Sequence, residues 1–600
     1  MISLAIRHAR LATMQGAQGS PQDGPLALVE DGAVAIDGER IAFMSKRGTG
    51  DAARTRVYIL PLAGGEATAL TDERSEISAF EWSPDGRSIA CLAVDRKSEA
   101  REREEKAGND ARVVDRNLLS RRLWIWDLLT GKGEKLASLG DLSAWEFDWA
   151  PDSSALVATV TDLNRTDDAY LKKRIAVLPR AGERREIVPA TGKIAEVAWS
   201  RDGKSVAWLG GVDAGDPWTG SLFVVPAPGG AARNLTGARE ESSTSISWRA
   251  DGKLAVSSAR GTKSVLSIVD PASGAWQDVV PAGLAVFSSA TWSMDGSRFA
   301  LAAATAASPT DVWTGSPGPA APPRPIVRSN PGLDALPVGE QETIRYRAQD
   351  GLEIEAVLIR PAGFAEGKRY PLVVIAHGGP ESYYLDAWQN AWSHPGQALS
   401  ERGYFVLFPN YRGSTGRGVA FAKSDHRDLG GKEFTDVLDG IDFLAAKGWI
   451  NPKRVGITGG SYGGYFTALG VTRWSDRFAA GVDMFGITSW ESYLGVSDIP
   501  VENSMVHWDL WCYEHAALCR ERSALGNLDR AATPTLILQG IDDERVPKAQ
   551  SDELYAALRW KGVPVEYVVY PREGHGFRER WHRLDAVTRL LAWMEKYLAG

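Results

Sequence analysis

The 600-residue sequence contains only three cysteines, Cys91, Cys512 and Cys519, and no CxxC pair. Three cysteines cannot form a disulfide framework, and without a CxxC pair neither a thiolate zinc site nor a dithiol redox centre is expected. We therefore expect the cysteines to be small buried hydrophobic side chains or bystanders.

Histidine is scarce in the N-terminal half, where no histidine lies between His8 and His377. A catalytic zinc site needs about three protein ligands, usually with histidines among them. The N-terminal half therefore lacks the histidines for a zinc site that follows its first strands, as a metal-dependent amidohydrolase would require.

The sequence also lacks a long apolar run and an excess of positive charge. The opening MISLAIRHARLATMQGAQGS has charges scattered through its apolar residues, and no later run approaches the ~20 apolar residues of a membrane span. Asp and Glu number 76 against 68 Lys and Arg, for a net charge of −8, which gives no general attraction to nucleic acid or anionic lipid. We expect a cytoplasmic protein that binds neither nucleic acid nor a membrane.

The N-terminal half repeats one pattern, in which an apolar run ends in tryptophan and a turn leads into a second apolar run. In FEWSPDGRSIACLAV and VAWSRDGKSVAWLG an Asp-Gly turn joins two predicted strands into a hairpin. Further strands after each hairpin indicate units of about four strands, which is typical of β-propeller blades. A weaker unit at AIDGERIAFMSKRG brings the count to six blades, and the segment before it leaves a seventh open. The repeated tryptophans are Trp82, Trp149, Trp199, Trp248 and Trp292.

Residues 1–36 are an atypical, strand-forming lead-in, so we expect the propeller over residues 37–330. The charged insertion SEAREREEKAGNDARVVDRN is interpreted as a solvated loop, because charge runs usually stay in water, with a substrate-binding arm as the alternative. The passage SPGPAAPPRPIVRSNPG (316–332) marks the domain boundary, because prolines remove backbone donors and glycines oppose regular structure.

A different pattern begins at residue 331. Apolar runs such as YPLVVIAHGG and GYFVLFPNYRG now alternate with longer helical stretches such as FTDVLDGIDFLAAKG. Strands spaced by helices predict a mostly parallel sheet that is covered on both faces. The expected fold is therefore an all-β propeller followed by an α/β domain over residues 331–600.

The stretch GITGGSYGGY (456–465) places Ser461 among glycines, directly behind a predicted strand. A Gly-x-Ser-x-Gly turn between strand and helix is typical of a nucleophile, because small neighbours expose the hydroxyl and let backbone approach a substrate. An ordinary glycine-rich turn is the alternative. The position at the carboxyl end of a central strand, where such sheets bind ligands, favours the nucleophile.

A serine nucleophile needs a histidine base and a carboxylate that orients it, and in α/β-hydrolases they follow in the order Ser, Asp or Glu, His. His575, in YPREGHGF, lies between two glycines after the last predicted strand and is the predicted base. The loop in LILQGIDDERVP offers three acids, of which we choose Asp543 and interpret Asp542 and Glu544 as solvated charges. The C-terminal domain is therefore predicted to be an α/β-hydrolase.

A developing oxyanion needs preorganised donors, which can lower the barrier by a few kcal/mol. One should be the backbone N–H of Tyr462, directly after the nucleophile. The second should come from the loop HGGP (377–380), which follows the strand PLVVIA and offers two amides without side chains. Taken alone, HGGP is also compatible with a simple turn.

With these residues the chain resembles the prolyl oligopeptidase family of serine peptidases, and most closely its acylaminoacyl-peptidase and dipeptidyl-peptidase-like branch. With the preceding propeller the resemblance covers nearly all of residues 37–600. The motifs that carry it are HGGP (377–380), PNYRGSTGRG (409–418), GGSYGGY (459–465), GIDDERVP (540–547) and GHGF (574–577).

The resemblance implies a catalytic triad of Ser461, Asp543 and His575, with the N–H groups of Tyr462 and Gly379 as oxyanion donors. It implies no cofactor, because the acyl-enzyme route needs none.

The resemblance also implies an S1 pocket lined by Tyr462, Trp490 and Tyr493; without it, these aromatic residues would be interpreted as core packing. It implies in addition that the propeller covers the active site and admits only short or unfolded peptides. The expected partners are therefore oligopeptide substrates, and a homo-oligomer stays open.

The leading prediction is a serine peptidase that releases N-terminal acyl-amino acids or short N-terminal fragments. The alternatives are a dipeptidyl aminopeptidase or oligo-endopeptidase of the same family, a carboxylesterase, and an inactive propeller scaffold that binds partners. Dipeptidyl peptidases of the family hold a free amine with two propeller glutamates. The adjacent pairs here, Glu104-Glu105 and Glu240-Glu241, lack the family's surrounding motif, which argues against free-amine recognition.

Overall fold

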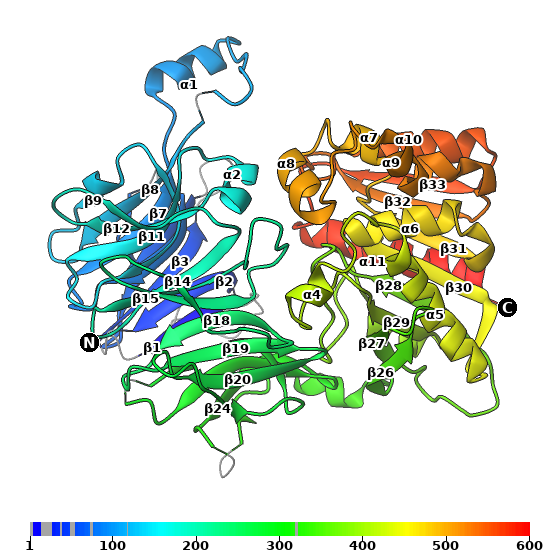
Figure 1. Ribbon diagram of the computed structural model, residues 1–600, viewed down its shortest axis with the longest axis horizontal. Coiled ribbons are helices and arrows are strands. Elements are labelled where there is room, and N and C mark those ends of the chain that lie inside the picture. Colours follow the sequence, from blue (N-terminus) through cyan, green and yellow to red (C-terminus); the bar gives the residue numbers. More distant parts are fainter. Residues whose placement is uncertain are drawn as a thin grey trace, which may run out of the picture.

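Six antiparallel sheets follow one another along the N-terminal half of the computed structural model (Figure 1), which describes residues 4–13, 27–36, 39–47, 54–72, 76–116, 118–293, 295–318 and 322–599. The first sheet contains β1–β5, and the others contain four strands each in chain order, from β6–β9 to β22–β25. The described residues thus confirm the six-bladed propeller. Its strands are β1 (Leu4–Thr13), β2 (Ala27–Ile36), β3 (Arg40–Arg47), β4 (Arg54–Pro61), β5 (Thr68–Ala69), β6 (Ile77–Trp82), β7 (Ser88–Val94), β8 (Arg121–Asp127), β9 (Gly133–Lys135), β10 (Ser143–Trp149), β11 (Ala155–Thr161), β12 (Arg174–Pro179), β13 (Arg185–Val188), β14 (Ile194–Trp199), β15 (Ser205–Gly210), β16 (Ser221–Pro226), β17 (Arg233–Asn234), β18 (Ser242–Trp248), β19 (Leu254–Arg260), β20 (Lys263–Val269), β21 (Trp276–Val280), β22 (Val286–Trp292), β23 (Phe299–Thr305), β24 (Ser308–Gly315) and β25 (Arg324–Pro325).

The repeated tryptophans end the first strand of their blades, and two of them are hydrogen-bonded to the preceding blade. The indole N–H of Trp149 donates to the carbonyl oxygen of Glu81, and that of Trp248 donates to the carbonyl oxygen of Ala198, at 3.3 and 3.1 Å. Each bond therefore reaches the residue before the tryptophan of the preceding blade. This contact gives the sequence repeat a physical reason.

The predicted lead-in adds to the first blade instead of forming a seventh. β1 pairs with β2 and β2 pairs with β3, all antiparallel. β1 also lies next to β22, the first strand of the last blade. The other parts of the lead-in, residues 1–3 and 14–26, lie outside the described residues, as does residue 37 at the predicted domain start.

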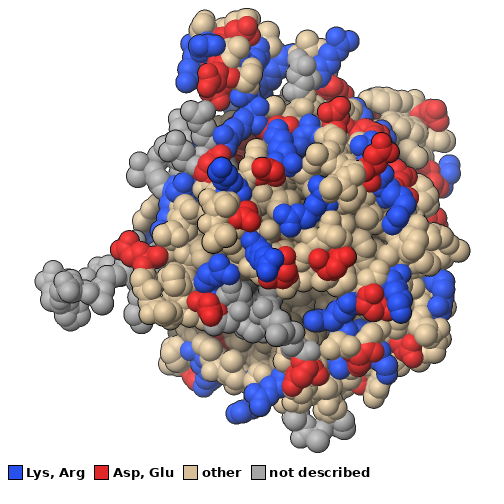
Figure 2. Space-filling model, turned by 90° about the vertical axis from the view of Figure 1, so that its left-hand side faces the viewer, with Lys and Arg blue, Asp and Glu red and all other residues tan. Residues whose placement is uncertain are grey.

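The charged insertion carries the short helix α1 (Glu99–Lys106), which buries no residue and projects from the propeller in Figure 1. The predicted exposure of this segment is therefore correct, but part of it is a helix and not a loop. On the propeller side of the molecule shown in Figure 2, basic and acidic side chains are interspersed and neither sign covers the face. Among the described helices, none combines the length and apolar character needed to span a membrane.

The C-terminal half forms one eight-stranded sheet in the order β26-β27-β29-β28-β30-β31-β32-β33. The pairs β26-β27 and β27-β29 are antiparallel, and every pair from β29-β28 to β32-β33 is parallel. The predicted mostly parallel sheet is thus confirmed. Its strands are β26 (Gln341–Arg347), β27 (Glu353–Ile359), β28 (Tyr370–Ala376), β29 (Phe405–Asn410), β30 (Ile450–Gly460), β31 (Ala480–Met484), β32 (Thr535–Gly540) and β33 (Val565–Tyr570).

Helices cover both faces of this sheet. Buried side chains of α5, α6 and α10 pack on one face, and those of α3 and α11 pack on the other. The remaining helix of the propeller is α2 (Thr166–Leu171). The helices of this domain are α3 (Gly396–Glu401), α4 (Val419–Ala422), α5 (Lys432–Ala446), α6 (Tyr462–Thr472), α7 (Trp490–Tyr493), α8 (Pro500–Glu502), α9 (Ala516–Arg522), α10 (Lys548–Trp560) and α11 (Arg580–Leu598), with a π-helical turn η5 (Asn503–His507) and 3₁₀ segments at Ala137–Leu139, Pro331–Ala335, Ser475–Arg477 and Ala524–Arg530.

The expectation that all three cysteines are bystanders is wrong for two of them. Cys512 and Cys519 form a disulfide, with their Cα atoms 5.7 Å apart. The chain turns back between Trp508 and α9, which brings the two thiols together across seven residues. Cys91, in β7, is free and buried as expected.

Candidate active site

Ser461 occupies the turn between β30 and α6. Its backbone φ is +61° and its ψ is −120°, which is uncommon and strained for a residue with a side chain. Its N–H donates to the carbonyl oxygen of Met484 at 3.0 Å, which holds the turn on β31. A Cβ at Gly459 or Gly463 would collide with the carbonyl oxygen of Ala376. The glycines are therefore needed for the turn to pack against the end of β28.

His575 and Asp543 are hydrogen-bonded, with 2.8 Å between Nδ1 and Oδ2. Because a carboxylate accepts, this bond assigns the proton to Nδ1 and leaves Nε2 as the basic nitrogen. The other oxygen of Asp543 accepts from the N–H groups of Arg545 and Val546, at 3.0 and 2.9 Å.

The loop after β32 turns one of its three acids inward. Asp543 is 4% exposed, whereas Asp542 and Glu544 are exposed. Gln539, at the end of β32, donates to the Asp543 carboxylate at 3.4 Å and to the carbonyl oxygen of Val546 at 3.2 Å. Asp543 is therefore held by its own loop and strand before it meets His575.

Ser461 and His575 lie at the same end of the sheet, after β30 and β33. The ring of Phe485 packs edge-on against His575, with 5.1 Å between the ring centroids, and Phe485 follows the residue that accepts from the Ser461 N–H. Within the described residues, no hydrogen bond joins the Ser461 hydroxyl to His575. Such bonds are often long without substrate and shorten in the complex.

The loop after β28 places two glycines beside the serine. A Cβ built on Gly378 would lie 3.2 Å from the Cβ of Ser461, so the loop and the turn are in direct contact. Gly379 has a φ of +128°. Tyr462 begins α6, so its N–H is one of the free donors at the helix N-terminus. Amides from two segments are thus available next to the nucleophile.

His377, the first residue of this loop, anchors it through hydrogen bonds to Ser414 and Tyr411. Its Nε2 lies 2.9 Å from the Ser414 hydroxyl, and the Tyr411 hydroxyl donates to its carbonyl oxygen at 2.8 Å. Burial lowers the pKa of His377 to about 4, so the ring is neutral at physiological pH. A neutral, buried ring is suited to holding the loop and not to proton transfer with substrate.

The aromatic residues predicted to line S1 lie together. Tyr462, Trp490 and Tyr493 are at most 2% exposed, and the Trp490 ring is 6.1 Å from that of Tyr462 and 5.7 Å from that of Tyr493. The Tyr462 hydroxyl donates to Glu433, and burial raises the pKa of that carboxyl to about 8. The cluster begins at the residue after Ser461 and continues into the domain core.

A chain of charged groups runs from the propeller to the loop behind the oxyanion donors. The Lys193 ammonium lies 2.5 Å from Glu502, and the His507 ring lies 2.8 Å from Glu502 through Nε2 and 2.6 Å from Glu381 through Nδ1. All four are buried. Glu381 is two residues from Gly379 in the sequence, so the chain ends next to the predicted oxyanion loop.

The carboxylates determine the charge of His507. Burial alone would lower the pKa of His507, but Glu381 and Glu502 outweigh it and raise the pKa to about 9. Burial would likewise raise the pKa of Glu502, whereas His507 and Lys193 lower it below its usual range. The four groups therefore balance as two cations and two anions.

The motif PNYRGSTGRG joins the two domains. The Arg412 guanidinium pairs with the buried carboxylate of Asp436 at 2.7 Å. The Gly416 N–H donates to the Ser242 hydroxyl of the propeller at 2.9 Å, and its carbonyl oxygen accepts from the Gly261 N–H at 2.8 Å. The motif thus contacts the propeller through Gly416 and His377 through Tyr411 and Ser414.

Neither glutamate pair offers two free carboxylates to an amine. Glu104 and Glu105 lie on the projecting α1. Glu241 is buried between Arg239 and Arg260, at 2.8 and 2.7 Å.

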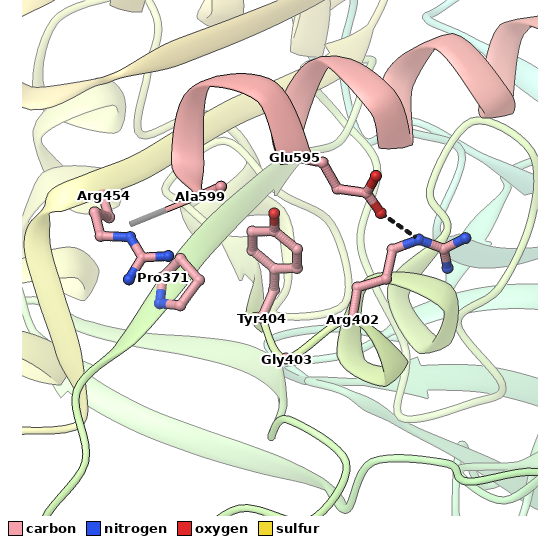
Figure 3. A pocket seen from close by; sticks show the side chains of 7 residues that line it. All are labelled: Pro371, Arg402, Gly403, Tyr404, Arg454, Glu595 and Ala599. Atoms are coloured by element: carbon pink, nitrogen blue, oxygen red, sulfur yellow. Dashed lines mark hydrogen bonds and ion pairs between the residues drawn. The ribbon is translucent and has the colours of Figure 1, made fainter.

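The cavity shown in Figure 3 lies at the amino ends of the parallel strands, opposite to Ser461. It measures about 410 Å³ and is bordered by Arg402, Tyr404 and Arg454, with Arg402 paired to Glu595 at 2.8 Å. Pro371, which also lines it, is at the amino end of β28, whereas Ser461 follows the carboxyl end of the parallel strand β30. This cavity is therefore remote from Ser461.

Sequence reasoning missed the charged chain and the hydrogen bond from Gln539 to Asp543. Glu381 directly follows HGGP and His507 is one of four histidines after Ser461, so both were visible as signals. The pairing of these residues was not visible in the sequence, because it runs through Glu502 to Lys193, which lies in the propeller.

Residues 390–600 match the family model described as the prolyl oligopeptidase family. The uncharacterized peptidase YuxL of Bacillus subtilis is 29% identical over 94% of this chain and 89% of its own length. The human acylamino-acid-releasing enzyme is 29% identical over 46% of this chain, but the match spans only 38% of that protein.

Among solved structures, the acylaminoacyl peptidase of Pyrococcus horikoshii superposes with a TM-score of 0.77, at 21% identity, over 96% of this chain and 90% of its own. That similarity concerns the fold and extends through both domains. The family model over residues 390–600 and the Bacillus subtilis relative that matches along both domains support one assignment, a serine peptidase of the prolyl oligopeptidase family.

Proposed function

We propose that the protein cleaves short peptides through an acyl-enzyme and releases N-acylated amino acids or short N-terminal fragments. The hydrogen bond between His575 and Asp543, at the carboxyl ends of the parallel strands where Ser461 occupies its strained turn, is the observation that carries the proposal. The similarity to acylamino-acid-releasing enzymes supports the choice of substrate.

In this proposal Ser461 Oγ attacks the carbonyl carbon while His575 Nε2 takes its proton. Asp543 keeps the proton on Nδ1 and stabilises the imidazolium. The N–H groups of Tyr462 and Gly379 donate to the oxyanion. His575 then gives the proton to the leaving amine, and water hydrolyses the acyl-enzyme by the same steps in reverse order.

We assign S1 to the aromatic cluster of Tyr462, Trp490 and Tyr493, which suits an apolar P1 side chain. The propeller, which we bound at residues 37–330, then covers the catalytic domain of residues 331–600 and restricts substrates to oligopeptides. Its ties to the catalytic domain through Ser242 and Lys193 support this arrangement.

A blocked N-terminus fits the charges of the site better than a free amine. A free amine needs an unpaired carboxylate as its partner. In the described part of the site, Glu381 and Glu502 already pair with His507 and Lys193. A neutral acyl group adds no unpaired charge.

The test compares p-nitroanilides of phenylalanine that carry an acetyl group, a free amine or one further residue, with Ser461→Ala as control. We expect preference for the acetylated compound and loss of activity in the variant. Preference for a free dipeptidyl compound would assign a dipeptidyl aminopeptidase. Faster cleavage of matched esters with no serine-dependent anilide turnover would overturn the peptidase proposal, and failure of a fluorophosphonate to label Ser461 would assign a scaffold.

A further inference from the structure

A second cavity, of about 390 Å³, lies in the propeller between blades three and four. Pockets that hold small molecules span about 300–1,000 Å³, so its size suits a substrate group. It is bordered by Trp145, Thr166, Ala169, Tyr170, Lys173, Lys193, Ile194, Ala195, Pro217, Trp218 and Thr219.

The cavity opens on the side of the propeller that meets the catalytic domain. Thr166, in its wall, donates to Asp498 at 2.9 Å, and the next residue, Asp167, accepts from the N–H of Glu502 at 2.9 Å. In Figure 1, α2 and α8 accordingly face each other across the junction of the domains. The cavity is thus part of the surface that the propeller presents to the active-site loops.

The cavity also lies close to the catalytic loop. The guanidinium of Arg545 stands 5.7 Å from the centre of the Tyr170 ring. Arg545 is two residues after Asp543, and two residues span at most about 7 Å of chain. Arg545 therefore links the wall of the cavity to the loop that carries Asp543.

Its lining combines aromatic rings with two ammonium groups. Trp145, Tyr170 and Trp218 are half-buried, so their rings are accessible to a ligand as well as to neighbours. Lys173 and Lys193 are each hydrogen-bonded to one carboxylate and one carbonyl oxygen. An ammonium group has three donors, so each lysine can donate a further hydrogen bond to an incoming carbonyl oxygen.

The charge balance selects the occupant. Lys193 is neutralised by Glu502 and Lys173 by Glu146, at 2.5 and 2.7 Å. No surplus positive charge is therefore left in this lining to hold a carboxylate, and a free amine would meet two ammonium groups. An uncharged group with an apolar or aromatic body and a carbonyl oxygen fits both the rings and the donors.

We propose that this cavity is a distal subsite that binds the uncharged, blocked N-terminal end of an extended peptide substrate, with preference for an aromatic acyl group. The proposal rests on the proposed peptidase function. It adds a specificity determinant in the propeller, built mainly by Trp218 and Tyr170, that acts several residues from the scissile bond.

The experiment compares acetyl and benzyloxycarbonyl caps on phenylalanine p-nitroanilides that carry one, two or three glycines between cap and phenylalanine. We expect the aromatic cap to lower KM about tenfold once the spacer reaches the cavity, with similar kcat. Trp218→Ala should remove this advantage without changing turnover of the acetyl compounds, and Trp218→Phe should retain most of it.

Trp276→Ala is the control, because this tryptophan is half-buried like Trp218 but lies on β21 of the fifth blade, outside the lining of the cavity. An equal loss for both caps in Trp218→Ala, or a cap advantage that persists in it, would overturn the subsite. The subsite would also be refuted if Trp218 instead determined a preference for substrates with a free carboxylate C-terminal to the scissile bond.

Equilibrium binding separates this proposal from the peptidase proposal. Benzyloxycarbonyl-diglycine amide should bind Ser461→Ala, and Trp218→Ala in that background should weaken binding about tenfold in calorimetry. Binding that is unchanged by Trp218→Ala would refute the subsite even if no anilide were cleaved.

Discussion

The ammonium of Lys193 in the propeller lies 2.5 Å from the carboxylate of Glu502 in the catalytic domain. Both side chains are buried. Glu502 also pairs with His507, and His507 pairs in turn with Glu381. The propeller is therefore coupled by charge to the loop that carries the predicted oxyanion donor. Removing one partner of such a buried pair leaves an unpaired charge, which is strongly destabilising.

Lys193→Met should therefore disturb the active site from another domain. We expect the variant to lose 10-fold or more in kcat/KM and several degrees in Tm, because Glu502 is left buried with one partner fewer. Lys204→Met is the matched control, since Lys204 is a propeller lysine with an 81% exposed side chain. Equal behaviour of the two variants would show that the inter-domain pair has no role in catalysis.

His507 should make the stability of the protein depend on alkaline pH. Its pKa rises from 6.5 to about 9 in the folded state. A raised pKa contributes stability that is complete below the unfolded value and is lost as the pH rises through the folded value. The Tm difference between the wild type and His507→Gln should thus be largest below pH 6.5 and shrink towards pH 9 and above. A constant difference across this range would contradict the assigned charge.

Asp543→Asn should lower kcat by roughly 10³–10⁴-fold, because an amide no longer fixes the tautomer of His575 or stabilises its imidazolium. Asp542→Asn is the control on the same loop and should stay within about twofold of the wild type, since Asp542 is exposed. Steady-state kinetics on an acetylated anilide measures both. Similar losses in the two variants would point to a loop effect instead of a triad.

The architecture was predictable because it depends on local patterns. Tryptophans that recur at blade intervals report a contact between adjacent blades, as Trp149 and Trp248 show. Gly459 and Gly463 report the tight packing of the turn at Ser461. The choice of Asp543 over its neighbours was made from its position, third after Gly540 and directly before the predicted turn ERVP, and in the structure it is the buried acid of the three.

The contacts that join distant segments were not predictable. Lys193 and Glu502 are 309 residues apart, and no local pattern pairs them. The bond between Cys512 and Cys519 was missed for another reason, since its two residues are near in sequence and only the turn between them brings the thiols together.

Gly379→Ala should impair the oxyanion site. Its φ of +128° suits glycine, and a Cβ there would collide with the backbone N of Glu381. We expect kcat to fall about 100-fold or more, with KM within about threefold, because the lost donor acts mainly in the transition state. Gly363→Ala is the control, with a φ of +70° and no atom within 4 Å of the added Cβ. If Gly363→Ala loses as much activity, backbone strain and not the oxyanion site would explain the loss.

The disulfide should stabilise the segment beneath the aromatic cluster. Cys512 lies in the same buried cluster as Trp490 and Trp508, and the Ser523 hydroxyl links the carbonyl oxygen of Cys519 to the N–H of Trp490, at 2.6 and 3.0 Å. Replacing both cysteines by serine should cost about 2 kcal/mol, seen as a lower Tm, and raise KM for phenylalanine anilides more than it lowers kcat.

Thiol titration in denaturant checks the bond directly. One thiol, that of Cys91, should react before reduction and three should react after it. Cys91→Ser is the control variant, because it also changes a buried cysteine but lies in the propeller, and it should leave KM unchanged. Three reactive thiols in the unreduced protein would contradict the disulfide.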